Sequence, residues 1–451
     1  MAERTDNTPE ERFNTSRRSV LAASGTGLAL AIAGCSSSGD DDEPADEPEP
    51  TDQETDQNET ADTQEEEPEE EEDTEPPDPE ATENSIIEPA TLKEWQDAGL
   101  VNLEELDERK RVVVLRIWET ETYEDGHIPG ALKWGADEFH AARVEGLAEA
   151  APMVPSGEAM DEILQRSGVC PKTTIVLSGP STLRASRAYW TLRYWGFPRE
   201  RVKILDGGYH AYGNEYELAT GTEPDPPQAN FSVKANGELN DGTRLGIAQM
   251  IQRVDLKHEG ERDDVFLDNR PDPDATIDTA VVDDPANYHE GEGFATKFSE
   301  GGTWKSADEI ETHLFGLDGV EDGDTIVTYC GSGYRAAMGF TALDAILGYD
   351  DVAVYDGSFS RQWAHYDGNN TEGNVPPDEW RVDKYERTDG DTGSSGLEIV
   401  VDEIPSLESA AANQLMHSDL VYMGEAEPLD ESGGGSTESG DGGGGDWGCS
   451  A

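Results

Sequence analysis

The chain has 451 residues, enough for two or three domains. Only 34% of the residues are hydrophobic, which is sufficient for compact cores only if part of the chain stays unfolded. Its 99 Asp and Glu against 32 Lys and Arg give a formal net charge of −67, which argues against nucleic acid and anionic membrane surfaces as partners. Because acidic residues also run through the patterned regions, the composition predicts a host with molar salt, where the Debye length falls to roughly 3 Å.

Residues 1–35 are typical of an export signal. Arg17 and Arg18 precede a mildly apolar stretch, 21–33, that is too short to span a bilayer, and the pair resembles a twin-arginine signal. Small residues then lead to Cys35, as in the lipobox of a secreted lipoprotein. We expect export by the twin-arginine route and lipidation of Cys35, which would anchor the protein to the outer face of the cell membrane. A short hydrophobic helix ending in a buried cysteine is the alternative.

Residues 36–88 form a predicted tether. They are almost entirely Asp, Glu, Thr, Pro, Gln and Ser, a composition that cannot bury enough apolar surface to offset chain entropy. We expect this acidic linker to be disordered.

One unit occurs twice in the patterned part of the chain. Its apolar runs are short, β-branched and bounded by charged residues or glycine, which is typical of buried strands in a parallel sheet. The expected strands are 112–115, 174–177 and 202–205 in the first copy, and 265–268, 325–328 and 352–355 in the second. Before the last strand of each copy, apolar residues recur at helical spacing; these are Ala185, Tyr189 and Leu192, then Ala336, Phe340, Leu343 and Leu347.

The sequence therefore predicts an α/β protein with two domains, each a mostly parallel sheet flanked by helices. Their expected bounds are 89–221 and 237–385, joined by a linker at 222–236. A largely disordered tail is expected at 386–451, since its final part is rich in glycine.

A glycine-rich loop stands between the strand and the helix of the second copy, where ligands of parallel sheets collect. It reads Cys330-Gly331-Ser332-Gly333-Tyr334-Arg335. The glycines allow successive N–H groups to converge, and the helix N-terminus adds partial positive charge. Such a loop favours the thiolate of Cys330 and would stabilise an anionic persulfide. A buried structural cysteine is the alternative, but it would gain nothing from this loop.

These motifs in order resemble the tandem-domain rhodanese family, which contains the thiosulfate and 3-mercaptopyruvate sulfurtransferases. The resemblance covers most of residues 90–385, and together with the signal it points to an exported lipoprotein of a halophilic archaeon. The matching segments are the Gly-His-Ile-Pro-Gly-Ala turn at 126–131, the late strand ends at 206–208 and 356–357, the Leu-Asp-Asn-Arg segment at 267–270, and the cysteine loop.

The resemblance implies a sulfurtransferase that carries sulfur as a persulfide on Cys330. The donor would be a small sulfur compound and the acceptor a thiol or cyanide, with no cofactor and a monomeric protein. Arg270 and Arg335 are implied as ligands of the anionic donor, and Asp268 as a supporting residue. The remaining substrate contacts would come from Gly331, Ser332, Gly333 and Tyr334.

The first copy has lost the implied chemistry. Sliding it onto the second places Gly179 on Cys330, Arg184 on Arg335, Arg116 on Asp268, and Trp118 on Arg270. We therefore expect the first domain to be an inactive scaffold that closes one side of the cleft, with His127 stabilising a turn. The second copy in turn lacks the glycine-histidine turn and has a segment with Phe294, Phe298 and Trp304 instead.

Several alternatives stay open. A phosphatase of the same fold would need five residues between cysteine and arginine, whereas this loop has four, so sulfur fits better than phosphate. The donor is thiosulfate or mercaptopyruvate, and a lipoprotein that binds sulfur or an oxyanion without turnover is the second functional class. Cys170 is expected to be a core residue, although a disulfide with Cys449 is compatible with export. No His and Cys cluster has metal-ligand spacing, so no metal is expected.

Overall fold

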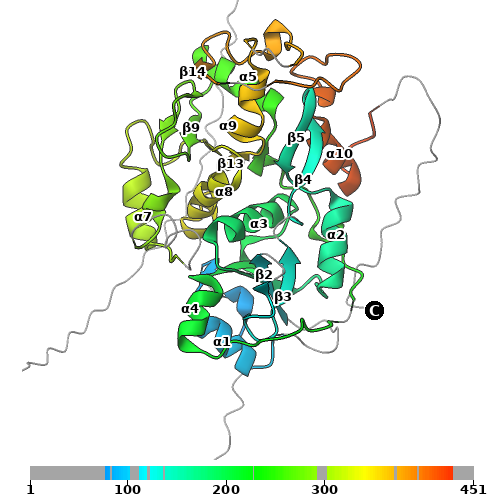
Figure 1. The fold of residues 1–451 in the computed structure, drawn as a ribbon, viewed down its shortest axis with the longest axis vertical. Coiled ribbons are helices and arrows are strands. Elements are labelled where there is room, and N and C mark those ends of the chain that lie inside the picture. The colour runs from blue at the N-terminus through cyan, green and yellow to red at the C-terminus, as the bar shows by residue number, and fades with distance from the viewer. Residues whose placement is uncertain are drawn as a thin grey trace, which may run out of the picture. The chain divides into compact units, whose positions relative to one another are not determined.

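The computed structural model describes residues 77–81, 84–101, 111–118, 122–135, 138–226, 228–291, 302–369, 373–393 and 396–429. The predicted export and lipidation residues Arg17, Arg18 and Cys35 lie outside these ranges, as do Phe294, Phe298 and Cys449. Two parallel sheets, each with helices packed on it, make up the described chain (Figure 1).

The first sheet has five parallel strands in the order β1-β7-β6-β2-β3. These are β1 (Ile86–Ile87), β2 (Arg111–Trp118), β3 (Leu132–Gly135), β6 (Thr173–Ser178) and β7 (Val202–Leu205). Its helices are α1 (Pro89–Asp97), α2 (Gly157–Arg166), α3 (Thr182–Tyr194) and α4 (Gly208–Glu215). An antiparallel hairpin of β4 (Ala141–Glu145) and β5 (Ala148–Met153) is inserted after β3.

The second sheet repeats this strand order in the second half of the chain, as β11-β9-β12-β13-β8, again all parallel. Its strands are β8 (Arg244–Leu245), β9 (Val265–Asp268), β11 (Val281–Val282), β12 (Ile326–Tyr329) and β13 (Val352–Tyr355). The helices are α5 (Ile247–His258), α7 (Ala307–Leu314), α8 (Tyr334–Thr341) and α9 (Ser358–Arg361), with a small antiparallel pair of β10 (Thr276–Ile277) and β14 (Thr388–Asp389). The predicted two-domain α/β fold is confirmed.

Burial explains why the apolar residues of the central strands follow one another without a break instead of alternating with polar residues. Every residue of β6, β7, β9, β12 and β13 is buried, because helices cover both faces of a parallel sheet. A π-helical turn at 342–346 extends α8, and the helix ends before Gly348, which has a φ of +68°.

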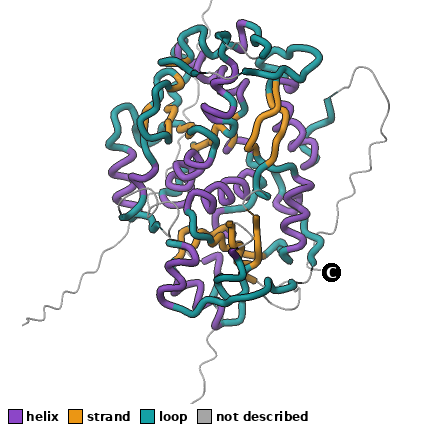
Figure 2. Tube along the Cα trace, in the orientation of Figure 1, coloured by secondary structure: helices purple, strands orange, loops and turns teal. Residues whose placement is uncertain are grey.

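Helices α3 and α8 pack against each other and connect the two domains (Figure 1). In Figure 2 they lie among the helices between the strands of the two sheets. One core cluster accordingly contains side chains of both domains, among them Leu192 and Phe340. Almost every residue of α3 is buried, so a charged side chain on this helix requires a partner.

The segment predicted as an interdomain linker packs into the core. Phe231 and Val233 are fully buried in the cluster that fills the first domain. The Asp161 carboxylate of α2 accepts a hydrogen bond from the Val233 N–H at 2.8 Å. Residues 228–236 are therefore an integral part of the fold rather than a free connection.

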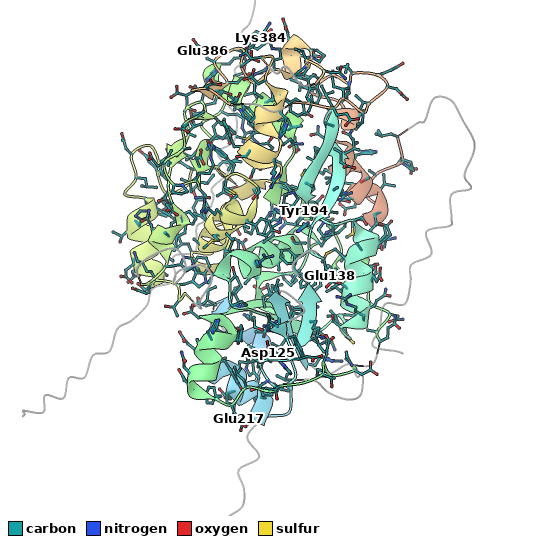
Figure 3. The ribbon with its side chains drawn as sticks, viewed as in Figure 1. Asp125, Glu138, Tyr194, Glu217, Lys384 and Glu386 are labelled. Atoms are coloured by element: carbon teal, nitrogen blue, oxygen red, sulfur yellow. The ribbon has the colours of Figure 1, made fainter. Side chains whose placement is uncertain are left out.

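Ordered structure also extends beyond the predicted domain boundary at 385. The helix α10 (Gln414–Met423) packs on β4 and α2, and its Asp419 accepts hydrogen bonds from Arg143 at 2.6 Å and from the Tyr194 hydroxyl at 2.8 Å. Figure 3 shows Tyr194 well inside the described region. The first part of the predicted tail therefore belongs to the folded body, whereas residues 430–451 lie outside the described chain.

Within the described ranges, no helix combines the length and the apolar character needed to cross a membrane.

Candidate active site

The cysteine loop begins where β12 ends. Cys330 is buried, with 3% of its surface exposed, and the Ser332 N–H donates to its Sγ at 3.4 Å. Gly333 has a φ of +81° and forms the N-cap of α8, so the chain enters the helix through a left-handed turn. The predicted loop between strand and helix is present, with one backbone N–H directed at the sulfur.

The corner after β13 holds the backbone of this loop. The Cys330 N–H donates to the Ser358 Oγ at 3.2 Å, and that hydroxyl donates to the Tyr355 carbonyl at 3.0 Å. The Phe359 N–H donates to the Cys330 carbonyl at 2.7 Å. Ser358 has a φ of +54°, an uncommon conformation for a residue with a side chain, and sequence reasoning did not predict its role.

Arg270 is held by Asp268, the acid two residues before it. Its Nε lies 2.9 Å from Asp268 Oδ1 and its Nη2 lies 2.5 Å from Oδ2, while Nη2 also donates to the Ala275 carbonyl. The guanidinium stands 4.0 Å from the ring centre of Phe359, which itself bonds to the cysteine loop. Asp268 therefore orients Arg270 beside the loop and compensates part of its charge. Arg335 lies in the first turn of α8 and is partly buried.

Two rings of the first domain meet the loop. The rings of Phe139 and His140 lie 6.3 and 6.2 Å from the ring of Tyr334, both edge-on. The first domain thus contributes one wall beside the loop, as the sequence suggested, and neither ring was predicted as part of it.

The corresponding place in the first domain has no nucleophile and no room for one. Arg116 pairs with Ser178 across β2 and β6, just as Asp268 pairs with Tyr329 across β9 and β12, so Gly179 takes the place of Cys330. A Cβ at Gly179 would lie 2.7 Å from the Ile117 carbonyl oxygen, so the neighbouring backbone leaves no room for a side chain at this position.

The second domain keeps a histidine that sequence reasoning missed. His127 Nδ1 lies 3.0 Å from the Tyr123 carbonyl oxygen, and His289 Nδ1 lies 3.1 Å from that of Pro285, four residues back in each case. Burial lowers the pKa of His127, which favours its neutral form. Both histidines stabilise a turn, and their equivalence is visible only in the structure, because the residues around His289 do not repeat the motif around His127.

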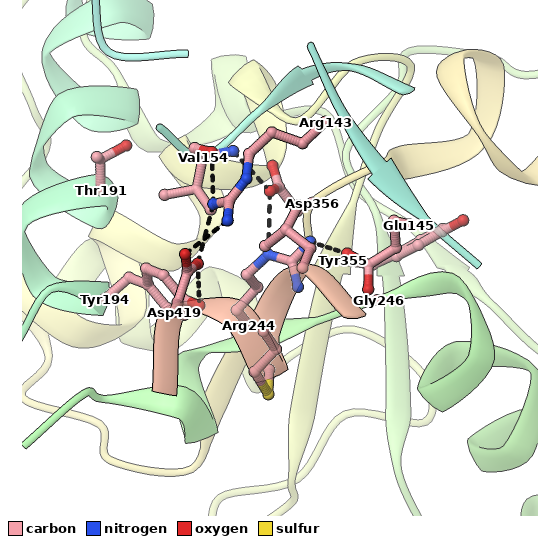
Figure 4. Close-up of polar contacts among 12 residues, drawn as sticks. Arg143, Glu145, Val154, Thr191, Tyr194, Arg244, Gly246, Tyr355, Asp356 and Asp419 are labelled. Carbon is pink, nitrogen blue, oxygen red and sulfur yellow. Dashed lines mark hydrogen bonds and ion pairs between the residues drawn. The ribbon is translucent and has the colours of Figure 1, made fainter. Parts of the chain in front are cut away.

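An interdomain ion cluster lies behind the cysteine loop, formed by Arg187, Asp356, Arg244 and Glu145. The fully buried Asp356 accepts a hydrogen bond from Arg187 Nη2 at 2.7 Å. Arg244 donates from Nε to Asp356 at 3.1 Å and also pairs with Glu145 (Figure 4). Burial opposes ionisation of Asp356, but the two guanidinium groups and the Val154 N–H hold its pKa below the usual value. Burial raises the pKa of Glu145 despite Arg244.

The same contact occurs in mirror form at the inactive site. Asp356 accepts the Val154 N–H of the first domain at 2.9 Å, and Asp206 accepts the Trp304 N–H of the second domain at 3.0 Å. Burial raises the pKa of Asp206 to about 6, because no guanidinium accompanies it. Each domain thus caps the strand end of the other, and of these two aspartates Asp356 is the one that pairs with arginines in the described part of the chain.

Cys330 is the free thiol of the described chain. Cys170 is buried just before β6 and is disulfide-bonded. Among the described residues, no group of three or more His, Cys, Asp or Glu is arranged to hold a metal ion.

The fold and the site define a two-domain α/β protein with a cysteine in a glycine-rich loop. The family of the rhodanese-like domain matches residues 90–215 and 255–365, so the chain belongs to that family. A Haloferax volcanii protein provisionally named a thiosulfate sulfurtransferase is 26% identical over 61% of this chain and 93% of its own length.

Two further matches cover a similar share of this chain. The thiosulfate sulfurtransferase of Corynebacterium glutamicum is 26% identical over 56% of this chain and 84% of its own. The solved structure of a 3-mercaptopyruvate sulfotransferase from Escherichia coli is 21% identical, with a TM-score of 0.46, over 61% of this chain and 99% of that one.

Proposed function

We propose that this protein is a sulfurtransferase that carries sulfane sulfur as a persulfide on Cys330. The Cys330 thiolate attacks the outer sulfur of thiosulfate, the sulfur–sulfur bond of the donor breaks, and its electron pair leaves with sulfite. The persulfide then gives its outer sulfur to cyanide or a thiol, and the Cys330 thiolate is restored. The observation that carries the proposal is the free thiol of Cys330 at the end of β12, with the Ser332 N–H 3.4 Å from its sulfur.

The loop and the nearby arginines have distinct roles in this proposal. Backbone N–H groups of Gly331 to Tyr334 stabilise the anionic sulfur, and Arg270 and Arg335 bind the negative charge of the donor. A local cation is required because a chain with a net charge of −67 otherwise repels an anionic donor. Mercaptopyruvate, which would leave pyruvate, is the other donor that this site chemistry accommodates.

The proposal is tested by isolating the loaded protein. Intact mass spectrometry after thiosulfate treatment and desalting should show one added sulfur atom, and cyanide should remove it with release of thiocyanate. Steady-state kinetics should follow the double-displacement pattern. A protein that keeps its sulfur in cyanide would instead be the non-turnover binding lipoprotein, and a protein that never gains sulfur would refute both functions.

Arg270→Gln should slow sulfur loading about tenfold. This effect is smaller than that of removing an unpaired cation, because Asp268 already compensates part of the charge of Arg270. Arg335→Gln should have an effect of similar size. Single-turnover loading in high salt isolates this step from transfer to the acceptor.

The control is the double variant Arg270→Gln with Asp268→Asn. Arg270→Gln alone leaves the buried Asp268 carboxylate without its arginine, which lowers stability, and Asp268→Asn removes that unpaired charge. Slow loading in the double variant therefore reports a loss of donor binding. Loading at the parental rate in both arginine variants would place the anion site elsewhere.

We also propose that the protein is a lipoprotein of a halophilic archaeon, exported by the twin-arginine route and anchored through Cys35. The paired arginines ahead of a short apolar stretch and the small residues before Cys35 support this proposal, and the charge of −67 supports the saline host.

Arg17→Lys combined with Arg18→Lys should block export, because the receptor of this route reads the paired guanidinium groups. Cys35→Ser should release exported protein from the membrane. Fractionation of the expressing host followed by immunoblotting measures both. An equal distribution between cytoplasm and membrane in the parent and all variants would contradict the proposed signal.

A further inference from the structure

Arg187 is a buried cation that the proposed chemistry does not yet use. It belongs to α3 of the first domain, its side chain is fully buried, and its Nη2 donates to Asp356 Oδ1 at 2.7 Å. Its Nε and Nη1 are also buried and have no hydrogen-bond partner among the described residues. Leaving two donors of a buried guanidinium unpaired is costly, so the position calls for a physical explanation.

The unpaired side of Arg187 faces the turn that ends the cysteine loop. A Cβ at Gly333 would lie 2.6 Å from Arg187 Nη1 and 2.9 Å from the Asp356 carbonyl oxygen. The guanidinium carbon is 5.9 Å from the ring centre of Tyr334 and 4.5 Å from that of Trp190. Nη1 therefore lies against the backbone of the loop, with aromatic faces on two sides that exclude water.

The repeat shows that this charge is specific to one site. The alignment that places Arg184 on Arg335 puts Arg187 on Met338, which is buried on α8. The helix of the catalytic domain thus presents no cation toward the inactive site of the first domain. At this pair of equivalent positions, the helix of the first domain carries a guanidinium and the helix of the second carries a methionine.

We propose that Arg187 is a positioning residue through which the first domain acts on Cys330. It fixes the left-handed turn at Gly333 and places a positive charge behind the loop, which favours the anionic sulfur of the thiolate and of the persulfide. The first domain is then a working part of the site as well as a wall. This inference deepens the proposed function, since it assigns a residue to that same site.

The surrounding charges are compatible with a net positive effect. Asp356 is shared between Arg187 and Arg244, and Arg244 also pairs with Glu145, so both carboxyl groups of the interdomain ion cluster have a guanidinium partner, whereas Arg187 Nη1 faces the turn at Gly333. The charged or titratable residues on the other described elements around the loop are Arg335 on α8, Asp268 at the end of β9 with its partner Arg270, Arg361 on α9, and His140 of the first domain.

The test is the pH dependence of Cys330 alkylation by iodoacetamide in the full chain, in high salt. This neutral reagent reports on the thiolate without any sulfur transfer. Arg187→Met should move the midpoint of the alkylation profile upward by about one pH unit, equivalent to about a tenfold loss of thiolate at a fixed pH below the midpoint. Arg187→Lys, which keeps the charge, should stay close to the parent.

Arg193→Met is the matched control. Arg193 also lies on α3 and donates across the interface to Asp344 at 3.1 Å, but Asp344 is about 16 Å along α8 from Gly333 at 1.5 Å per residue. Arg193→Met should lower the melting temperature and leave the midpoint of the alkylation profile unchanged. If Arg187→Met does not fold, Arg187→Gln, which can still donate to Asp356, is measured instead.

An unchanged midpoint in Arg187→Met or Arg187→Gln, with a lowered melting temperature alone, would overturn the inference and leave Arg187 structural. An equal shift in Arg193→Met would also overturn it. Because alkylation needs no donor, failure of this inference is distinguishable from failure of the proposed function, which is read from sulfur addition to the parent protein.

Discussion

Cys330→Ser should abolish both the addition of sulfur from thiosulfate and the formation of thiocyanate. A hydroxyl oxygen cannot carry sulfane sulfur as a persulfide does, and removal of a catalytic nucleophile lowers turnover to background, on the order of 10⁴-fold or more. The substitution should not disturb the loop, because the described hydrogen bonds of Cys330 are made by its backbone, apart from the long contact of Sγ with the Ser332 N–H. Intact mass spectrometry and a thiocyanate assay measure the two losses.

Cys170→Ser is the matched control for this variant. Cys170 is as buried as Cys330 and is disulfide-bonded, but it lies at the opposite, amino-terminal end of its strand, before β6. It should retain sulfur loading on Cys330 even if the melting temperature falls. Addition of sulfur to Cys330→Ser at the parental level would remove Cys330 from the mechanism, whatever the behaviour of the control.

The sheets and the position of the cysteine were predictable because the relevant signals are local. Apolar β-branched runs such as 202–205 form buried parallel strands, and this one coincides with β7. The shared strand order then places equivalent residues at equivalent strand ends, so Gly179 could be matched to Cys330 by sequence alone. Strand-to-helix loops in such sheets lie at the edge where ligands bind.

The features that sequence reasoning missed depend on contacts between distant segments. Arg187 lies on a helix that is buried on almost every side, so the sequence spacing does not show which face of the helix Arg187 shares with a partner. Only the structure shows that this partner is Asp356 of the other domain. Helix α10 was missed because its apolar residues have mixed spacing and it packs through the bonds of Asp419 with Arg143 and Tyr194. Ser358 has a glycine, Gly208, as its counterpart in the first domain, and only the structure shows its hydroxyl bonded to the loop.

Gly333→Ala should reduce sulfur loading by about a hundredfold or more, because it changes the turn on which the loop and Arg187 meet. A φ of +81° costs a residue with a Cβ about 1–2 kcal/mol. The new methyl group would lie 2.6 Å from Arg187 Nη1 and 2.9 Å from the Asp356 carbonyl oxygen, so the loop must move away from both. A displacement of about 1 Å at a reacting atom is enough for a hundredfold loss.

Gly331→Ala separates this effect from a general intolerance of the loop to side chains. A Cβ at Gly331 would meet only the Ser360 side chain, with Oγ at 3.3 Å, and the position does not have a positive φ. The Ser360 hydroxyl can rotate away, so the loading rate of Gly331→Ala should fall by less than about tenfold, below the cost of losing one preorganised donor.

Single-turnover loading with thiosulfate, together with the melting temperature of each variant, makes the comparison. If the two alanine variants load sulfur equally well, the left-handed turn at Gly333 and its contact with Arg187 do not govern the reactivity of Cys330. If Gly333→Ala alone is slow while it remains folded, the geometry of that turn limits the attack on the donor.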